Sequence, residues 1–254
     1  MFDHVTIRAS SREASERFYE TVLATVGIAK TYSDQHLAEW NDFSLAEVGA
    51  EHPLTRGLHI GFAAPTRGHV ERFWEVGVEA GYRDDGAPGP RPQYTESYYG
   101  GFLLDPDGNS AEAVHYEWVR ESGGIDHLWI RVADVAASKR FYEVVAAHAG
   151  FGLRTDRPDR ARFAGEDRSG SFSLVAGDRP TEHVHLAFPV ADDTTVDAFH
   201  HELTEAGYRD NGPPGERPIY HPGYYGAFVL DPDGNNVELV NHHRQSGSSG
   251  IDTP

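Results

Sequence analysis

The sequence of 254 residues contains no cysteine. Without thiols the chain has no disulfide bonds, thiolate nucleophiles, iron–sulfur clusters or cysteine zinc sites, so any metal must be held by His, Asp or Glu. Positive charge is also scarce, because 22 Lys and Arg stand against 40 Asp and Glu, a net charge of −18. Such a surface repels phosphate backbones and anionic membranes, so we expect neither nucleic acid nor membrane as a partner.

Long apolar runs are missing as well. No run approaches the roughly 18 apolar residues that a membrane-spanning helix needs. The start of the chain, MFDH, lacks the basic and then apolar pattern of a secretory signal. The chain also has no Gly-x-Ser-x-Gly elbow and no phosphate loop, since the Gly/Pro-rich segment 86–90 follows a predicted helix. We therefore expect a cytoplasmic protein that is neither a nucleotide-binding enzyme nor a serine hydrolase.

What the sequence does contain is an internal repeat. The segment 98–109 (YYGGFLLDPDGN) returns as 224–235 (YYGAFVLDPDGN), an offset of 126 residues. Nearer the start, 17–20 (RFYE) returns as 140–143, an offset of 123 residues. Self-similarity of this kind predicts two like domains. We place the two domains, the linker and the flexible Gly/Ser-rich tail as follows: domain 1 at 1–120, linker at 121–124, domain 2 at 125–243 and tail at 244–254.

Each copy predicts the same order of elements. A strand at 4–8 leads into a helix with apolar residues every three to four positions, for which Ser10 and Glu13 form a capping box and Gly27 an end. A second strand at 58–62 leads into a helix that ends at Gly81, and an Asp-Pro-Asp-Gly-Asn turn marks a final hairpin. Four helix phenylalanines are expected in the core: Phe18, Phe73, Phe141 and Phe199. Each half thus comprises two units of strand, helix and strands, which indicates an α+β fold.

The repeat selects among the fifteen histidines. Two pairs of histidines and one pair of glutamates recur at the repeat offsets, and they form two candidate sets: His4, His59 and Glu112, and His127, His185 and Glu238. Two neutral imidazoles and a carboxylate make a facial set with open coordination positions, as suits Fe(II) or another divalent ion that must also bind substrate. Ordinary strand residues copied by duplication are the alternative interpretation.

With these residues, the chain resembles the vicinal oxygen chelate superfamily, which groups glyoxalase I, fosfomycin- and bleomycin-resistance proteins and type I extradiol dioxygenases. The resemblance covers nearly the whole chain, and its clearest signature is the Asp-Pro-Asp-Gly-Asn turn before each Glu. It implies a tandem repeat of paired βαβββ units that form cupped mixed β-sheets. It also implies a metal in each cup, held by a His from the first strand, a His from the equivalent strand of the next unit, and a Glu from the last strand, positions on which the two candidate sets fall. Whether the units pair within each copy, between copies or between chains stays open.

The sequence departs from the patterns of two subfamilies at positions that bear on the type of reaction. Glyoxalase I adds a fourth ligand, for which copy one offers Glu47 but copy two has Ala176. The dioxygenase signature matches segment 219–221 and Asp231 to Glu238, but Phe228 stands where a Tyr is expected. We predict His221, Tyr220 and Tyr224 as catalytic, since an imidazole or phenol there can move a proton. We predict substrate contacts from Phe228, Tyr94 and Tyr98. Tyr225 falls on the opposite face and is expected to pack.

These features favour an enzyme that uses a divalent ion to bind a small substrate through adjacent oxygens. Ring cleavage with Fe(II) is the leading interpretation, and isomerase or lyase chemistry with Mn, Zn or Ni is the alternative. A bleomycin-resistance-like binding protein is a third reading, which the duplicated triad argues against. A copy one that serves only as a structural partner is a further alternative, and a homodimer is compatible with the sequence.

Overall fold

The computed structural model describes residues 1–117, 124–166 and 169–243. Most of the expected linker, residues 121–123, and the expected tail at 244–254 lie outside the described residues. The described chain consists of four βαβββ units in sequence order, as the repeat predicts. The expected α+β class with cupped mixed sheets is confirmed.

The elements of the first two units have these bounds: β1 His4–Ala9, α1 Arg12–Leu23, a 3₁₀ turn Ala24–Val26, β2 Tyr32–Ser33, β3 Leu37–Trp40 and β4 Phe43–Glu47; β5 His59–Ala63, α2 Arg67–Glu79, β6 Arg83–Pro90, β7 Tyr99–Leu104 and β8 Ser110–His115. The last two units follow the same plan: β9 Ile125–Val132, α3 Val135–Ala149, β10 Gly152–Arg157, β11 Arg160–Ala164 and β12 Ser171–Ala176; β13 His185–Pro189, α4 Asp193–Glu205, β14 Asp210–Glu216, β15 Tyr225–Leu230 and β16 Asn236–Asn241.

The start of α1 differs from the expected capping box. Ser11, not Ser10, is the N-cap, and its side chain accepts a hydrogen bond from the backbone N–H of Ala14. Ser10 instead bonds to Asp107, both through its hydroxyl group and through its backbone N–H at 3.0 Å. Ser10 therefore bonds to the distant residue Asp107 instead of capping the helix. The expected stop at Gly27 is correct, since its φ of 80° is in the left-handed region that favours glycine.

The two copies of the sequence do not form one sheet each. One sheet has the order β14-β15-β16-β13-β1-β4-β3-β2 and combines the first and fourth units. The other has the order β10-β11-β12-β9-β5-β8-β7-β6 and combines the second and third units. The units join through antiparallel pairing of β1 with β13 and of β5 with β9. Units are therefore exchanged between the copies within a single chain.

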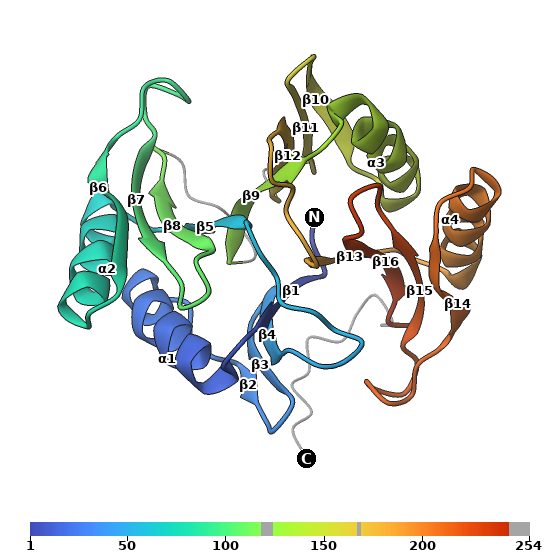
Figure 1. Ribbon diagram of the computed structural model, residues 1–254, viewed down its shortest axis with the longest axis horizontal. Helices are drawn as coiled ribbons and strands as arrows, with labels where there is room; N and C mark the ends of the chain where they lie inside the picture. Colours follow the sequence, from blue (N-terminus) through green and yellow to red (C-terminus); the bar gives the residue numbers. More distant parts are fainter. Residues whose placement is uncertain (118–123, 167–168, 244–254) are drawn as a thin grey trace.

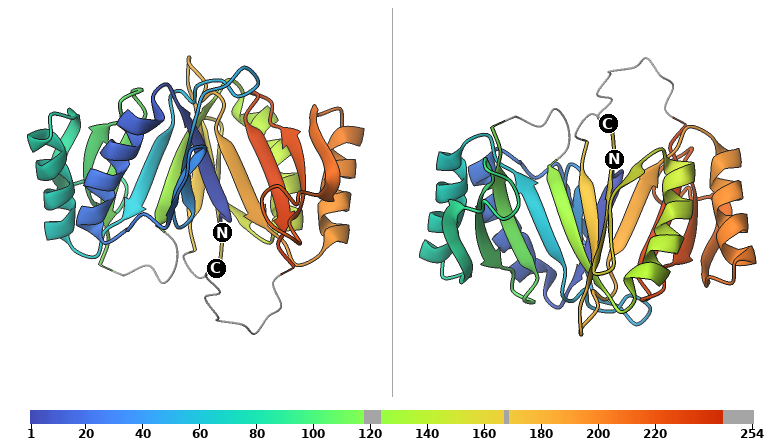
Figure 2. Two further views of the ribbon diagram at one scale, coloured as in Figure 1. Left: turned by 90° about the horizontal axis from the view of Figure 1, so that it is seen from below. Right: turned by 90° about the horizontal axis from the view of Figure 1, so that it is seen from above.

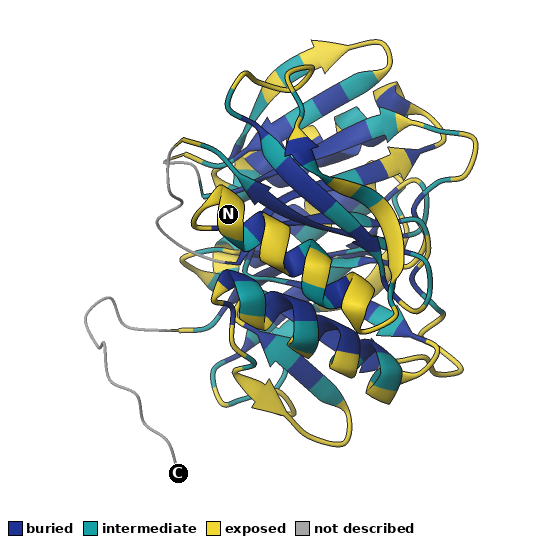
Figure 3. Cartoon of the chain, turned by 90° about the vertical axis from the view of Figure 1, so that its left-hand side faces the viewer, coloured by how far each residue is buried: buried dark blue, intermediate teal, exposed yellow. Residues whose placement is uncertain are grey.

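Helices cover the face of each sheet that lies opposite its cup. Figures 1 and 2 show α1 and α2 together on one flank and α3 and α4 together on the other, with the strands between them. Figure 3 shows that the exposed residues of α1 and α2 follow the outer side of the helices. Their inward residues join one core that includes the four expected phenylalanines, all fully buried: Phe18, Phe73, Phe141 and Phe199.

Alternation along the strands divides each sheet into a core face and a cup face. In β1, Val5, Ile7 and Ala9 are buried in the core, so the residues between them face the cup. The Asp-Pro-Asp-Gly-Asn turn joins β7 and β8 as expected, and Asp105 fixes it by accepting bonds from the backbone of Asp107 and Asn109. None of the helices in the described ranges is long and apolar enough to cross a membrane.

Candidate metal centres

Two groups of metal-ligating side chains lie on the cup faces of the two sheets. The β1/β13 cup, formed by the first and fourth units, contains His4, His185 and Glu238. The β5/β9 cup, formed by the second and third units, contains the other three residues, His59, Glu112 and His127. All six residues singled out from the sequence therefore lie in one group or the other.

The membership of the two groups differs from the expected sets. The sequence sets kept each copy together, whereas the structure exchanges His4 and His127 between them. The physical reason is the sheet pairing. Because β1 pairs with β13, His4 lies opposite Ala187, next to the strand that carries His185. Because β5 pairs with β9, His127 lies opposite Gly61, two residues from His59.

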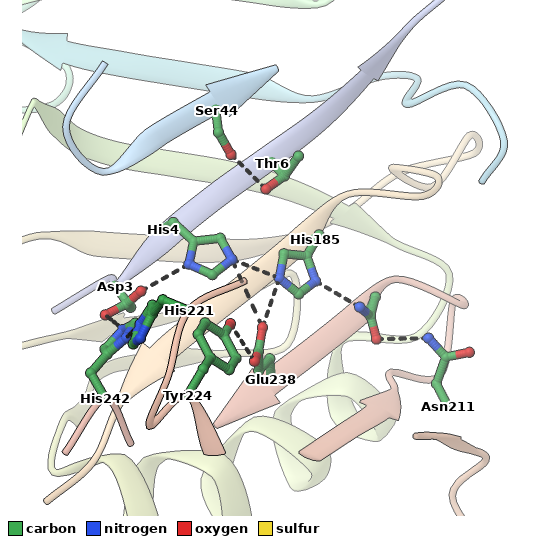
Figure 4. A network of polar contacts seen from close by, with 11 residues as sticks. Asp3, His4, Thr6, Ser44, His185, Asn211, His221, Tyr224, Glu238 and His242 are labelled. Carbon is green, nitrogen blue, oxygen red and sulfur yellow. Dashed lines mark hydrogen bonds and ion pairs between the residues drawn. The ribbon is translucent and has the colours of Figure 1, made fainter. Parts of the chain in front are cut away.

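The three donor atoms of each group converge on one point. In the β1/β13 cup, Nε2 of His185 lies 3.0 Å from Nε2 of His4 and 3.1 Å from Oε2 of Glu238, and the third separation is 3.8 Å. Figure 4 shows these side chains turned toward one another. Ligand atoms about 2.1 Å from an ion and at right angles to each other are about 3.0 Å apart. The observed separations fit three adjacent positions around one ion.

The β5/β9 cup has the same geometry in a more regular form. Oε2 of Glu112 lies 3.1 Å from Nε2 of His59 and 3.3 Å from Nε2 of His127, and the two imidazole nitrogens are 3.3 Å apart. No fourth His, Asp or Glu of the described residues joins either group. Glu47, considered from the sequence as a fourth ligand, pairs with Ala9 on the core side of β1 and is exposed. Both sites therefore have three ligands and leave coordination positions open.

Hydrogen bonds to the second nitrogen of each histidine fix its tautomer in the β5/β9 cup. Nδ1 of His127 donates to Asp126 at 2.9 Å. Nδ1 of His59 lies 3.1 Å from the hydroxyl oxygen of Ser110, which itself donates to Asp85 at 2.7 Å and so accepts from the ring. In these tautomers each Nε2 faces the ligand position and binds an ion once any proton on it is displaced, and the carboxylates make the imidazoles more basic.

In the β1/β13 cup only one histidine is oriented by a carboxylate. Nδ1 of His4 donates to Asp3 at 2.8 Å. Nδ1 of His185 lies 2.6 Å from the amide of Asn236, which in turn accepts a bond from Asn211. An ion on Nε2 leaves the proton of His185 on Nδ1, which then needs a hydrogen-bond acceptor. Turning the side-chain amides of Asn236 and Asn211 by 180° places the Asn236 oxygen there. The histidine pair here is thus less electron-rich than the pair in the β5/β9 cup.

Each ligand glutamate is held by a buried tyrosine. The hydroxyl group of Tyr98 donates to Oε1 of Glu112 at 2.7 Å, and that of Tyr224 donates to Oε1 of Glu238 at 2.6 Å. Only Oε2 remains for an ion. The pKa of both tyrosines is raised by burial and by the neighbouring carboxylate, so the phenols stay protonated as donors. The expected roles of Tyr98 in substrate contact and Tyr224 in catalysis stay predictions, but both hydroxyl groups are already used to orient a ligand.

The protonation of the two centres without metal differs. Burial raises the pKa of Glu112, but hydrogen bonds with His127 and His59 outweigh it and lower the pKa to about 2. Burial likewise lowers the pKa of His127, but bonds with Asp126 and Glu112 raise it to about 9. In the other cup burial dominates, raising the pKa of Glu238 to about 7. Metal binding in the β5/β9 cup must therefore displace a proton from an imidazolium.

His221 belongs to a chain of polar side chains beside the β1/β13 centre (Figure 4). Its Nε2 lies 2.8 Å from Nδ1 of His242, whose Nε2 lies 2.8 Å from Asp3. Its Nδ1 donates to the carbonyl oxygen of Pro222 at 2.8 Å. These contacts link Pro222 through the two imidazoles to the carboxylate of Asp3, which also accepts from His4. The chain ends at His4, a metal-ligand candidate.

The remaining predicted residues lie around the cups at different depths. Phe228 pairs with Glu238 across the sheet, and its ring centre is 6.1 Å from that of His185. Tyr220 is 62% exposed at the rim and packs on Tyr224. Tyr94, at 41% exposure, contacts Trp129 in the other cup. Tyr225 points to α4, as expected, and donates to Asp197.

Sequence reasoning missed the residues that support the ligands. Asp3 and Asp126 carried a usable signal, because the same Asp-His dipeptide stands in both copies. His242 carried none, because Tyr116 occupies its position in copy one and a filter based on duplication rejects it. Tyr116 takes over part of its role by donating to Asp126 at 3.3 Å.

Cups built from paired βαβββ units, each with two histidines and a glutamate, are the architecture that the resemblance implied. The chain belongs to the Glyoxalase/Bleomycin resistance protein/Dioxygenase superfamily, whose family model matches residues 1–113 and 124–239. Among solved structures it is similar to glyoxalase I from Zea mays, with 20% identity, a TM-score of 0.67 and coverage of 95% of this chain and 92% of that one.

A second similar structure comes from Bacillus subtilis subsp. subtilis str. 168 and is provisionally named as a dioxygenase. It has 13% identity and a TM-score of 0.63, and the match covers 96% of this chain and 85% of the other. At these identities both likenesses show the fold alone. No curated protein matches the sequence.

Proposed function

We propose that this protein is a divalent-metal enzyme whose substrate chelates the ion through two adjacent oxygens, with Fe(II)-dependent ring cleavage as the favoured reaction. The observation that carries the proposal is the convergence of two Nε2 atoms and one carboxylate oxygen, 3.0–3.8 Å apart, in each cup. A bound ion supplies Lewis acidity toward adjacent substrate oxygens and, as Fe(II), a site for dioxygen.

The number of ligands supports this class of reaction. Two histidines and one carboxylate form the facial triad that is typical of non-haem Fe(II) oxygenases. A four-ligand site of the glyoxalase I type would need a further carboxylate, and Glu47, the candidate weighed from the sequence, faces away from both groups. Two neutral imidazoles and one carboxylate also leave one positive charge of a dication uncompensated. A substrate with an ionised oxygen next to a second oxygen balances that charge.

The protein side chains around the ligands are suited to an aromatic substrate. Phe102 and Phe228 lie at equivalent positions, each with its ring centre about 6 Å from a ligand histidine: 6.0 Å from His59 and 6.1 Å from His185. Each ring can pack against a substrate ring and orient it. Arg91 and Arg217 cover the other side of these phenylalanines, with guanidinium carbons 5.3 and 5.6 Å from the ring centres.

Proton transfer in the β1/β13 cup is assigned to His221. We propose that its Nδ1–H exchanges the bond with Pro222 for one with a substrate oxygen, while His242 and Asp3 hold the ring in position through its Nε2. The β5/β9 cup has Thr95 at the position of His221 and Tyr116 at that of His242. The two cups therefore differ in the ability to move a proton, and the β1/β13 cup is the better equipped.

Metal content tests the first part of the proposal. Protein purified without a chelating column is loaded anaerobically with Fe(II), and metal per chain is measured by elemental mass spectrometry. We expect two ions in the wild type and one in each of the matched variants Glu112→Gln and Glu238→Gln. Retention of two ions in either variant, or no ion in the wild type, contradicts the ligand assignment and favours a binding protein.

Oxygen uptake tests the reaction. The Fe(II) protein is mixed with catechol in an oxygen electrode, and the yellow ring-opened product is followed by absorbance. We expect uptake and colour to be lost together in the Glu112→Gln, Glu238→Gln double variant. If the loaded protein consumes no oxygen but isomerises the hemithioacetal of an α-ketoaldehyde and a thiol, the glyoxalase-like alternative replaces ring cleavage.

A further inference from the structure

The third unit contributes two adjacent arginines, Arg160 and Arg162, to the wall of the β5/β9 cup. Register shows which residues share its cup face. Trp129 pairs with Ser173, Ser173 pairs with Arg162, and Arg160 lies two residues along the same strand. All of them are therefore on the same face as His127. In a chain with a net charge of −18, two adjacent arginines beside a candidate metal centre are a pronounced local reversal of charge.

The β1/β13 cup has no such wall. Its first unit is built in the same register, with Thr6 paired to Ser44 and Ser44 to Glu39. Glu39 thus stands at the position of Arg162, and Thr6 at that of Trp129. The hydroxyl groups of Thr6 and Ser44 bond to each other at 2.6 Å, as Figure 4 shows. The two cups share the same candidate ligands, but Glu39 stands where the other cup has Arg162, and Arg8 on the same face of β1 is a cation whose charge acts on His185.

Arg160 is fixed in place beside the centre. Its guanidinium carbon lies 4.9 Å from the ring centre of Trp129, and its Nε and Nη2 donate to Ser173 at 3.2 and 3.0 Å. The Trp129 ring in turn lies 6.1 Å from the ring of His59. The guanidinium carbon is therefore within about 11 Å of the centre of the His59 ring, which a small ring compound with one side group can span.

The guanidinium groups of Arg160 and Arg162 have N–H donors available for a ligand. Two of the five N–H groups of Arg160 bond to Ser173, and within the described ranges no carboxylate lies within ion-pair distance of Arg160 or Arg162. Burial and the like charge of Arg162 lower the pKa of Arg160 and outweigh the opposing charge of Asp159. The nearest acids of this cup serve the ligands, since Asp85 accepts from Ser110 and Asp126 from His127.

We propose that the β5/β9 cup selects substrates that carry an anionic group, such as a carboxylate, remote from the chelating oxygens, and that Arg160 and Arg162 bind that group. In the β1/β13 cup Glu39, at the place equivalent to Arg162, offsets the charge of Arg8, so this cup takes uncharged substrates. The inference rests on the proposed function, because it presumes that a chelating substrate enters the cup. One chain then offers two sites with the same metal chemistry and different substrate charge.

The experiment compares two chelators of similar shape and different charge, 3,4-dihydroxybenzoate and 4-methylcatechol. Zn(II) replaces Fe(II) so that the probes bind without turnover. The full chain carries Glu238→Gln, which leaves the β5/β9 cup as the loaded site, and affinities are measured by calorimetry. We expect the carboxylate to bind at least roughly tenfold more tightly, and Arg162→Gln and Arg160→Gln each to remove most of this preference while 4-methylcatechol binding is retained.

The reciprocal background isolates the other cup. In a chain with Glu112→Gln, we expect 4-methylcatechol to bind at least as well as the carboxylate, and Glu39→Arg to shift the preference toward the carboxylate. Equal binding of the two probes in the β5/β9 cup, unaffected by the arginine variants, overturns this inference and leaves the proposed function standing. Failure of both probes to bind the metal-loaded protein overturns the proposed function and the inference with it.

Discussion

Gly61 makes the regular geometry of the β5/β9 centre possible, and replacing it with alanine gives a sharp test of the ligand assignment. A Cβ atom at this position would lie 2.5 Å from Cε1 and 2.7 Å from Nδ1 of His127. Carbon atoms in ordinary contact are about 3.5–4.0 Å apart, so the imidazole must retreat by about 1 Å. Metal sites tolerate displacements of about 0.5 Å, and the bond to Asp126 would also be strained.

The β1/β13 cup shows how a Cβ atom opposite the histidine affects the spacing of the candidate ligands. The residue paired with His4 is Ala187, so a Cβ is already present, and the His4 to Glu238 separation there is 3.8 Å against 3.3 Å between His127 and Glu112. We therefore expect Gly61→Ala to weaken metal binding in the β5/β9 cup by roughly 10- to 100-fold, the usual effect of disturbing the support of a ligand.

The assay is competition for Zn(II) with a chromophoric chelator in a Glu238→Gln background, where the β5/β9 cup alone binds. The matched control is Ala187→Gly in a Glu112→Gln background, which removes a Cβ instead of adding one and is expected to bind Zn(II) no more weakly. Thermal unfolding checks that each variant is folded. A folded Gly61→Ala protein with wild-type affinity would refute the argument that His127 is a ligand held against Gly61.

Three further predictions concern the supporting side chains. Tyr224→Phe removes the bond to Oε1 of Glu238, and we expect a loss of metal affinity of roughly 10- to 100-fold, measured by the same competition, because a bond to a charged group is worth about 1.5–3 kcal/mol. His242→Ala breaks the link between His221 and Asp3, so the pH profile of catechol turnover should change while metal content stays at two ions per chain; an unchanged profile would contradict the proton-transfer role. His127 has a pKa raised from 6.5 to about 9, so its contribution to the stability of the metal-free protein is complete below pH 6.5 and is lost as the pH rises through 9. Melting temperature should fall across that window, by a free energy on the order of 3 kcal/mol at most, and the fall should be absent in His127→Gln.

The sequence was informative wherever local pattern and repetition carry the information. The hairpin turns, the helix phenylalanines and the four-unit plan follow from turn chemistry and periodicity, which act over a few residues. The six candidate ligand residues were found because duplication preserved them at fixed offsets. Ser10 shows the limit of local reasoning, since its partner Asp107 lies far along the chain and no capping rule could anticipate it.

Which ligands meet was decided only by tertiary structure. The four units have the same apolar pattern, so each first strand could pair with any other and bury an equivalent face. Pairing of β1 with β13 and of β5 with β9 settles the choice, and with it the exchange of His4 and His127 between the two sets. The supporting chain through His242 depends on the same pairing, because it joins the fourth unit to Asp3 of the first; the arginine wall lies within the third unit, and the pairing of β5 with β9 brings it beside His59. The sequence therefore determined the residues and the plan of each unit, and the packing of one unit against another determined the sites, because contact between distant strands leaves no periodic trace in the chain.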